Sequence, residues 1–210
     1  MRKLLSILLL INSIAVISAQ KPSDAQKIIE DYLNSVRASA VQTSFELKVI
    51  PKNGVNSQAV SGNLIMKANQ FYLTMDDVKV WYNGTTQWAL FEQNKEVTIT
   101  EPTAGELAET NPMAVLAGFT AKSKVNFSRQ KNAGNHIIEL TPLKANDQFV
   151  KVTVQFVKSS NQLHSIYVLN RDGSRNELTL KNYRSNVAVT AATFRFDEAK
   201  FPGVVMNDLR

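Results

Sequence analysis

The sequence predicts a mainly β protein with helices (α+β), built as an unclosed antiparallel β-barrel of about 11 strands. Three observations support this class. Apolar and polar residues alternate with a period of two through much of residues 43–183. Asn-Gly and Asp-Gly pairs, which favour tight hairpin turns, recur at Asn53, Asn83 and Asp172. An amphipathic helix precedes the alternating segments, and a short apolar helix interrupts them.

The first 19 residues have the layout of a secretory signal peptide. Arg2 and Lys3 precede an apolar stretch, residues 4–17, and Ala19 offers a small residue for cleavage. At 1.5 Å rise per residue the stretch covers about 21 Å, less than the roughly 30 Å of bilayer hydrocarbon, which favours a cleaved leader over a membrane anchor. We therefore expect an exported protein in which residues 20–210 form a single domain.

An amphipathic helix is expected at the start of the mature chain. Ser23 and Gln26, three residues apart, form a capping box, and apolar residues then recur at helical spacing. The resulting apolar face should lie against a large apolar surface. It is made by Ala25, Ile28, Ile29, Tyr32, Leu33, Val36 and Ala40.

Eleven segments have the pattern of successive antiparallel strands. The clearest is residues 150–156, where valines and a phenylalanine alternate with Lys151, Thr153 and Gln155. One face is then wet and the other apolar, as a half-open barrel requires. The expected strands are residues 43–49, 62–67, 71–75, 78–82, 87–91, 96–100, 124–128, 136–141, 149–157, 162–169 and 176–183.

Residues 101–119 interrupt the strands. A polar helical stretch, residues 105–110, is followed by Asn111 as N-cap and Pro112 at the first helical position. The helix that follows is apolar nearly all round as far as Phe119, so we expect it at the mouth or floor of the curved sheet, where both its sides are covered. Two interpretations stay open, an ordinary core helix and a lid over a cavity.

The residues needed for catalysis or metal binding are scarce. The chain has no cysteine, which excludes disulfides, thiolate metal sites and a lipid-carrying cysteine after the leader. His136 and His164 are the only histidines, and neither has a second ligand at metal-binding spacing. No Gly-x-Ser-x-Gly elbow is present. We expect no metal, no cofactor and no enzymatic activity; the alternative is a glycosidase whose paired carboxylates are assembled by the fold.

The charge of the chain is mildly basic. Removing Arg2 and Lys3 with the leader leaves 22 of the 24 Lys and Arg against 18 Asp and Glu, a formal charge of +4. The basic residues are scattered, without a run or interleaved aromatic residues. We therefore expect no nucleic-acid partner.

Several short motifs occur in a fixed order along the mature chain. Residues 62–67 run into Phe71, and an Asn-Gly turn is followed by Trp88. The Asn-Pro-led apolar helix, residues 111–119, comes next, and the chain ends with Phe194-x-Phe196, a Pro-Gly-Val triplet at 202–204 and an aspartate at 208. Together and in this order they resemble the LolA-type family of periplasmic outer-membrane lipoprotein carriers, over nearly the whole mature chain.

The resemblance implies a concave apolar face, covered by helices, that holds the acyl chains of a lipoprotein. It implies a soluble, monomeric periplasmic carrier. Its partners would be acylated lipoproteins, an inner-membrane lipoprotein-releasing ABC transporter and an acceptor at the outer membrane. The alternative is a periplasmic lipid-binding or lipoprotein-sensing module of the same fold. The expected cavity and lid residues are Phe45, Leu47, Leu64, Met66, Phe71, Leu73, Trp88, Leu90, Met113, Leu116, Phe119, Val152, Val154 and Phe156.

The chain departs from the family pattern at one place. Where family members commonly carry Arg-Pro after the lysine of the second strand, this sequence has Ala68 and Asn69. In the family that arginine resembles a latch, bonding backbone carbonyls of the lid helix. Asn69 or Gln70 would have to replace it with neutral hydrogen bonds, at roughly half the strength.

Overall fold

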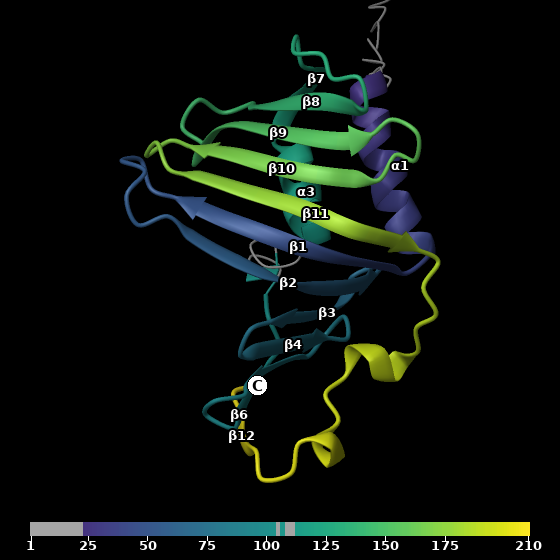
Figure 1. Ribbon diagram of the computed structural model, residues 1–210, viewed down its shortest axis with the longest axis vertical. Helices are drawn as coiled ribbons and strands as arrows, with labels where there is room; N and C mark the ends of the chain where they lie inside the picture. Colours follow the sequence, from purple (N-terminus) through teal and green to yellow (C-terminus); the bar gives the residue numbers. More distant parts are fainter. Residues whose placement is uncertain (1–22, 104–105, 108–111) are drawn as a thin grey trace, which may run out of the picture.

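The computed structural model describes residues 23–103, 106–107 and 112–210, in which one strongly curled sheet carries helices against its inner face (Figure 1). The predicted signal peptide, residues 1–19, and the predicted N-cap Asn111 lie outside the described residues. Of the predicted polar helical stretch, residues 106 and 107 are described and are helical. Within the described ranges, no helix combines the length and apolar content needed to cross a membrane.

The sheet has twelve strands in the described part of the chain. They are β1 (Val41–Ile50), β2 (Gln58–Lys67), β3 (Gln70–Met75), β4 (Val78–Tyr82), β5 (Gln87–Phe91), β6 (Glu96–Thr100), β7 (Ser123–Phe127), β8 (Asn135–Pro142), β9 (Phe149–Val157), β10 (Leu163–Asn170), β11 (Arg175–Ser185) and β12 (Val205–Asp208). Their order across the sheet is β12-β6-β5-β4-β3-β2-β1-β11-β10-β9-β8-β7. Because β12 and β7 are the two ends of this order, the sheet is unclosed, as predicted.

Two sequential meanders make up eleven of the twelve strands, and one long-range ladder joins them. β1 to β6 are hairpin neighbours, as are β7 to β11, and β1 pairs antiparallel with β11 so that Val41 lies opposite Ser185 and Ile50 opposite Arg175. The eleven predicted strands correspond to β1–β11. The prediction of about 11 strands misses β12, because β12 is exposed throughout and its residues show no alternation. β12 also pairs parallel with β6, whereas an antiparallel sheet is expected from the sequence.

Helix α1 (Asp24–Ala38) follows from its cap and its apolar face. The Ser23 side chain accepts a hydrogen bond from the Gln26 N–H at 3.2 Å, which satisfies one free backbone donor of the first turn. Ala25, Ile29, Tyr32, Leu33 and Val36 are buried. The helix lies across one end of the strands in Figure 1 and packs against β2, β7 and the second helix.

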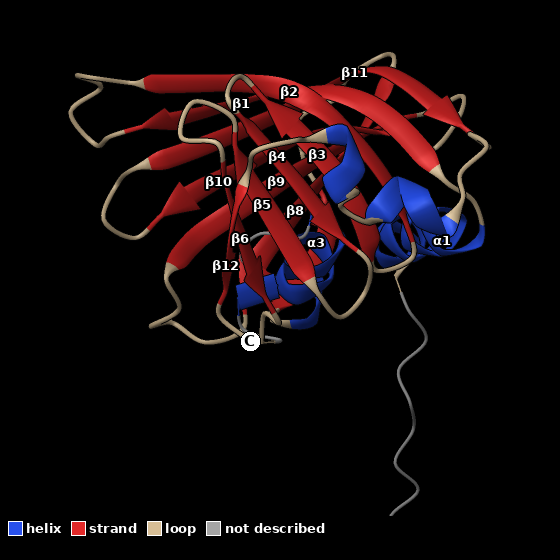
Figure 2. Cartoon of the chain, turned by 90° about the horizontal axis from the view of Figure 1, so that it is seen from below, coloured by secondary structure: helices blue, strands red, loops and turns tan. Residues whose placement is uncertain are grey.

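Helix α3 (Pro112–Ala121) lies on the same side of the curved sheet as α1 (Figure 2). It packs against β7, β8 and α1. Met113 and Leu116 are buried, and the ring of Phe119 meets that of Phe149 edge-on at 5.0 Å between centroids. The predicted apolar helix is therefore present against the inner face of the sheet.

Candidate functional site

The inner face of the sheet and the facing sides of α1 and α3 form one apolar cluster, called here the inner cluster. Side chains from β1, β2, β3 and β9 contribute to it at every second position, because successive residues of a strand point to opposite faces. Twelve of the predicted cavity and lid residues belong to this cluster: Phe45, Leu47, Leu64, Met66, Phe71, Leu73, Met113, Leu116, Phe119, Val152, Val154 and Phe156.

The two remaining predicted residues, Trp88 and Leu90, lie on the opposite face. In the β4–β5 ladder Trp88 is paired with Trp81, and paired residues share a face. Trp81 points away from the interior, since Val80 and Tyr82 on either side of it pack in the inner cluster. The expectation that Trp88 and Leu90 share the interior with the other twelve is wrong, because β5 is apolar from Trp88 to Phe91 and its alternation does not distinguish the faces.

Trp88 and Leu90 instead form an outer cluster with Trp81, Val97, Ile99 and Phe196. The C-terminal segment covers it. The ring of Phe196 meets Trp81 edge-on at 5.4 Å and stacks on Phe201 at 5.2 Å, and the Lys79 ammonium lies 5.6 Å from the Phe201 ring centre. A cavity of about 450 Å³ opens beside this cover, between Trp88, Met206 and residues 192–200. Phe196 of the Phe-x-Phe motif thus serves the outer face, a role that its sequence pattern did not indicate.

Side chains fill the space between α3 and the sheet. Leu116 is 0% exposed and Met113 8% exposed, and both belong to the inner cluster. Val152, Val154 and Phe156 on β9 are each 0% exposed. The inner face is therefore covered by packed helix side chains, and an apolar ligand would contact it only if those side chains moved.

Two buried hydroxyl groups interrupt the apolar interior. Among the described residues, the Tyr32 hydroxyl and the Ser123 hydroxyl are buried and have no hydrogen-bond partner. A buried donor without a partner costs roughly 1–3 kcal/mol. Tyr32 projects from α1 onto β9, where its ring meets Phe156 edge-on at 5.5 Å. Such a group retains its capacity to donate a hydrogen bond.

Tyr183, at the far end of β11, is the aromatic neighbour of Tyr32. Their ring centroids are 6.5 Å apart, but no hydrogen bond of standard geometry joins the two hydroxyls. Burial raises the pKa of Tyr183 to about 12. Burial also raises the pKa of Tyr32 well above its ordinary value, and the charge interaction with Tyr183 and the nearness of the two hydroxyls add to this rise. Both phenols therefore stay protonated at neutral pH and act as neutral donors.

The β2–β3 turn stands where the family latch was expected. The N–H of Ala68, whose φ is +52°, donates to the Val36 carbonyl at the end of α1 at 3.0 Å. The Gln70 side chain donates to the Asn83 carbonyl at 2.7 Å, and Asn69 to the Gly84 carbonyl at 3.5 Å. The turn therefore holds α1 by its backbone and the β4–β5 turn by its side chains.

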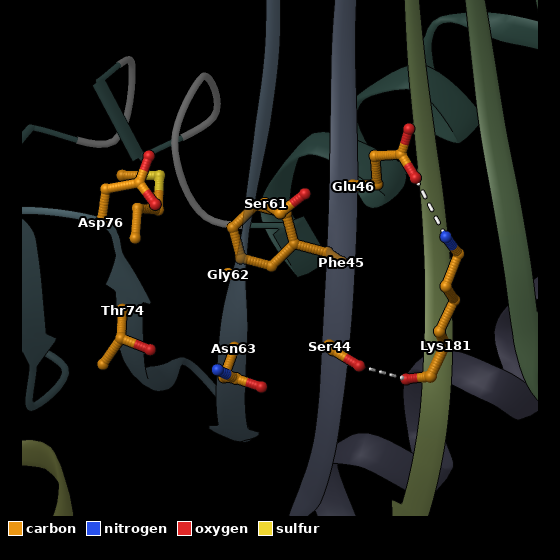
Figure 3. Close-up of a pocket in the computed structure, with 10 residues that line it drawn as sticks. Ser44, Phe45, Glu46, Ser61, Gly62, Asn63, Thr74, Asp76 and Lys181 are labelled. Carbon is orange, nitrogen blue, oxygen red and sulfur yellow. Dashed lines mark hydrogen bonds and ion pairs between the residues drawn. The ribbon is translucent and has the colours of Figure 1, made fainter.

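A second cavity, of about 460 Å³, lies across β1, β2, β3 and β11 and has a largely polar lining (Figure 3). Lys181 and Lys48 both bind the Glu46 carboxylate, at 2.9 and 3.0 Å, and the hydrogen bond from Lys181 lowers the pKa of Glu46. The ring of Phe45 lies against Gly62, where a side chain on residue 62 would collide with it. Hydroxyl, amide and charged groups line most of this cavity, so it is unsuited to hydrocarbon chains.

The described residues offer no cluster of three or more His, Asp or Glu that could hold a metal ion. Fold and site together define a helix-covered, unclosed half-barrel whose inner face is apolar. The model of the family described as outer membrane lipoprotein carrier protein LolA matches residues 37–197, and the chain belongs to this family. The resemblance seen in the sequence is thereby confirmed.

One solved structure of low sequence identity shares this fold, and weaker similarities are found to others. An uncharacterized conserved protein from Thermus thermophilus matches with a TM-score of 0.57 and 8% identity, over 89% of this chain and 99% of its own. A LolA superfamily protein from Nitrosomonas europaea matches with a TM-score of 0.44 and 10% identity, over 84% and 100%. The Pseudomonas aeruginosa MucA/MucB complex gives 0.47 and 12%, over 84% and 62%. A comparison with curated proteins finds no significant match.

Proposed function

We propose that this protein is a periplasmic carrier that binds the acyl chains of lipoproteins in its half-barrel and shuttles them from the inner to the outer membrane. The observation that carries the proposal is the inner cluster. It is a continuous apolar surface, covered by two helices, in a chain of the LolA family. Its donor would be an inner-membrane lipoprotein-releasing ABC transporter, and its acceptor would lie at the outer membrane.

The energetics of acyl chains dictate how such a carrier must release its cargo. Each buried methylene is worth about 0.8 kcal/mol, so complete burial of two or three chains would hold the cargo by tens of kcal/mol against transfer into water. Transfer must therefore run from cavity to cavity or from cavity to membrane. Partial burial beneath a movable cover allows this without exposing the chains.

Helix α3 is the proposed cover. It is apolar nearly all round, and it packs on β7, β8 and α1. Met113, Leu116 and Phe119 would leave the sheet when α3 moves, and acyl chains would take the place of their side chains against β9. Methionines suit such a surface because they adapt to chains of different length, and Met66 and Met113 lie in the inner cluster.

Mass spectrometry of the organic extract from protein purified out of the periplasm tests the proposal. Co-purifying acylated peptide supports the carrier, whereas phospholipid or glycolipid would support the alternative lipid-binding module. Leu73 and Thr74 are neighbours on β3 that face opposite sides, Leu73 inward and Thr74 toward the polar cavity. Leu73→Asp should abolish co-purification and Thr74→Asp should preserve it. Absence of any lipid from folded wild-type protein would contradict the proposal.

A further inference from the structure

Tyr32 and Tyr183 lie where the apolar interior meets the surface. Tyr32 is 1% exposed and belongs to the inner cluster, while Tyr183 is half-buried and packs against that cluster. Helix α1 passes the ends of β9 and β11 (Figure 1), and the ring of Tyr32 on α1 lies against Phe156 of β9 and Tyr183 of β11. An acylated ligand has a similar gradient, with hydrocarbon chains on one side of its ester groups and a polar portion on the other.

The hydroxyl of Tyr32 would be stabilised by a hydrogen-bond acceptor. It is a neutral donor in an apolar surrounding, where the Tyr183 hydroxyl lies near it but no described residue accepts its hydrogen bond with standard geometry. A hydrocarbon chain has no acceptor to offer. An ester carbonyl has one, and it carries neither a charge nor a donor of its own that would remain unsatisfied. A free carboxylate would bring a charge into the apolar interior at a higher cost.

We propose that Tyr32 and Tyr183 form a subsite that donates hydrogen bonds to the ester carbonyls of bound acyl chains. The subsite makes the carrier selective for ester-linked chains over chains without a carbonyl. It rests on the proposed function, because the acyl chains must lie along the inner cluster for their ester groups to reach α1 and β11. Tyr32 would then be the specificity-determining residue, and Tyr183 would extend the subsite toward the surface.

Binding of two matched lipopeptides tests this subsite. One carries two ester-linked acyl chains, and the other carries ether-linked alkyl chains of equal length, which lack the carbonyls. Dissociation constants are measured by displacement of a fluorescent apolar probe. Tyr32→Phe should weaken binding of the ester lipopeptide by about threefold to tenfold, the range of one lost hydrogen bond, and leave the ether lipopeptide unchanged. Tyr183→Phe should act in the same direction.

Tyr82→Phe is the matched control, since Tyr82 is a buried tyrosine of the inner cluster on β4, where its ring lies tilted against that of Phe71. It should leave the ratio of ester to ether affinity unchanged. Equal weakening of both lipopeptides by Tyr32→Phe would assign Tyr32 a packing role and overturn the subsite. A ratio of ester to ether affinity that is unchanged in both Tyr32→Phe and Tyr183→Phe would overturn the subsite as well. In either case, binding of both lipopeptides by the wild-type protein would still support the carrier function. Failure of wild-type protein to bind either lipopeptide would refute the carrier function itself.

Discussion

Replacing Leu116 with alanine tests whether α3 is a lid or a fixed part of the core. Leu116 is 0% exposed, and a buried Leu→Ala change costs about 2–5 kcal/mol. If α3 can leave the sheet while the sheet stays folded, the Leu116 side chain stabilises only the closed state, in which α3 packs on the sheet. Leu116→Ala then destabilises this closed state by about 2–5 kcal/mol relative to the open state. At a factor of ten per 1.4 kcal/mol, exchange of α3 amide protons should accelerate by roughly 30-fold to several thousandfold.

Leu90 provides the matched control. It is a leucine 1% exposed, but it lies in the outer cluster on β5, away from α3. Leu90→Ala weakens the folded sheet equally whether α3 is open or closed. It should therefore accelerate exchange of β9 amides, which open by global unfolding, and leave exchange of α3 amides unchanged.

Hydrogen exchange followed by mass spectrometry, together with the rate of uptake of a fluorescent apolar probe, measures both variants. Leu116→Ala should accelerate probe uptake and Leu90→Ala should not. Equal acceleration of α3 and β9 amides by Leu90→Ala would mean that α3 opens only when the whole domain unfolds. That result would refute the lid and return α3 to the interpretation as an ordinary core helix.

Three further predictions concern stability. Gly62→Ala should lower the free energy of unfolding in urea titrations by about 1–3 kcal/mol or more, because the new Cβ would lie 2.8 Å from the Phe45 ring and closer still to a backbone oxygen. At Gly118 a Cβ would meet nothing within 4 Å, so Gly118→Ala should raise the free energy of unfolding by up to ~1 kcal/mol. The same sign for both variants would contradict the packing argument. Phe196→Ala should cost about 3–5 kcal/mol and red-shift tryptophan emission as the outer cluster is exposed; an unshifted spectrum would contradict this cover. The pKa of Tyr183 is about 12 in the folded protein, against an ordinary value of 10.0. As the pH rises, Tyr183 therefore loses its proton in the unfolded chain before it does so in the folded one. The contribution of Tyr183 to the free energy of unfolding is fully present below pH 10 and is lost as the pH rises to about 12. Tyr183→Phe should flatten the alkaline part of the stability curve, and a curve of unchanged slope would argue against the raised pKa.

Sequence patterns predicted those parts of the fold where each residue faces either water or the interior. Alternation on β9 placed Val152, Val154 and Phe156 on the inner face, where the structure has them. It failed at Val150, which is 41% exposed because the pairing of β9 with β10 shifts register there. The Ser23 cap fixed the start of α1 in the same way. In both cases one local rule decides the outcome.

The rest depends on information that local patterns lack. Trp88 and Leu90 sit on a strand that is apolar on both sides, so only its pairing with β4 decides which face they occupy. β12 is held by backbone pairing with β6, and its exposed side chains leave no periodic signal. The unpaired Tyr32 hydroxyl was likewise hidden, because the helical spacing of Tyr32 identifies a core position and says nothing of hydrogen-bond partners.

The ladder between β1 and β11 has a consequence for folding during synthesis. It joins residues 41–50 to residues 175–185, so β1 cannot pair with β11 until nearly all of the chain has been synthesised. Pairing between such distant segments makes folding slow, because the entropy of closing a long loop is lost before the contacts between its ends can stabilise the structure. Until then β1 and β11 both remain open edges, at which unrelated chains could pair. The newly made polypeptide should therefore depend on a holding chaperone that binds extended segments, and should acquire resistance to proteolysis in a single late step after synthesis passes residue 185.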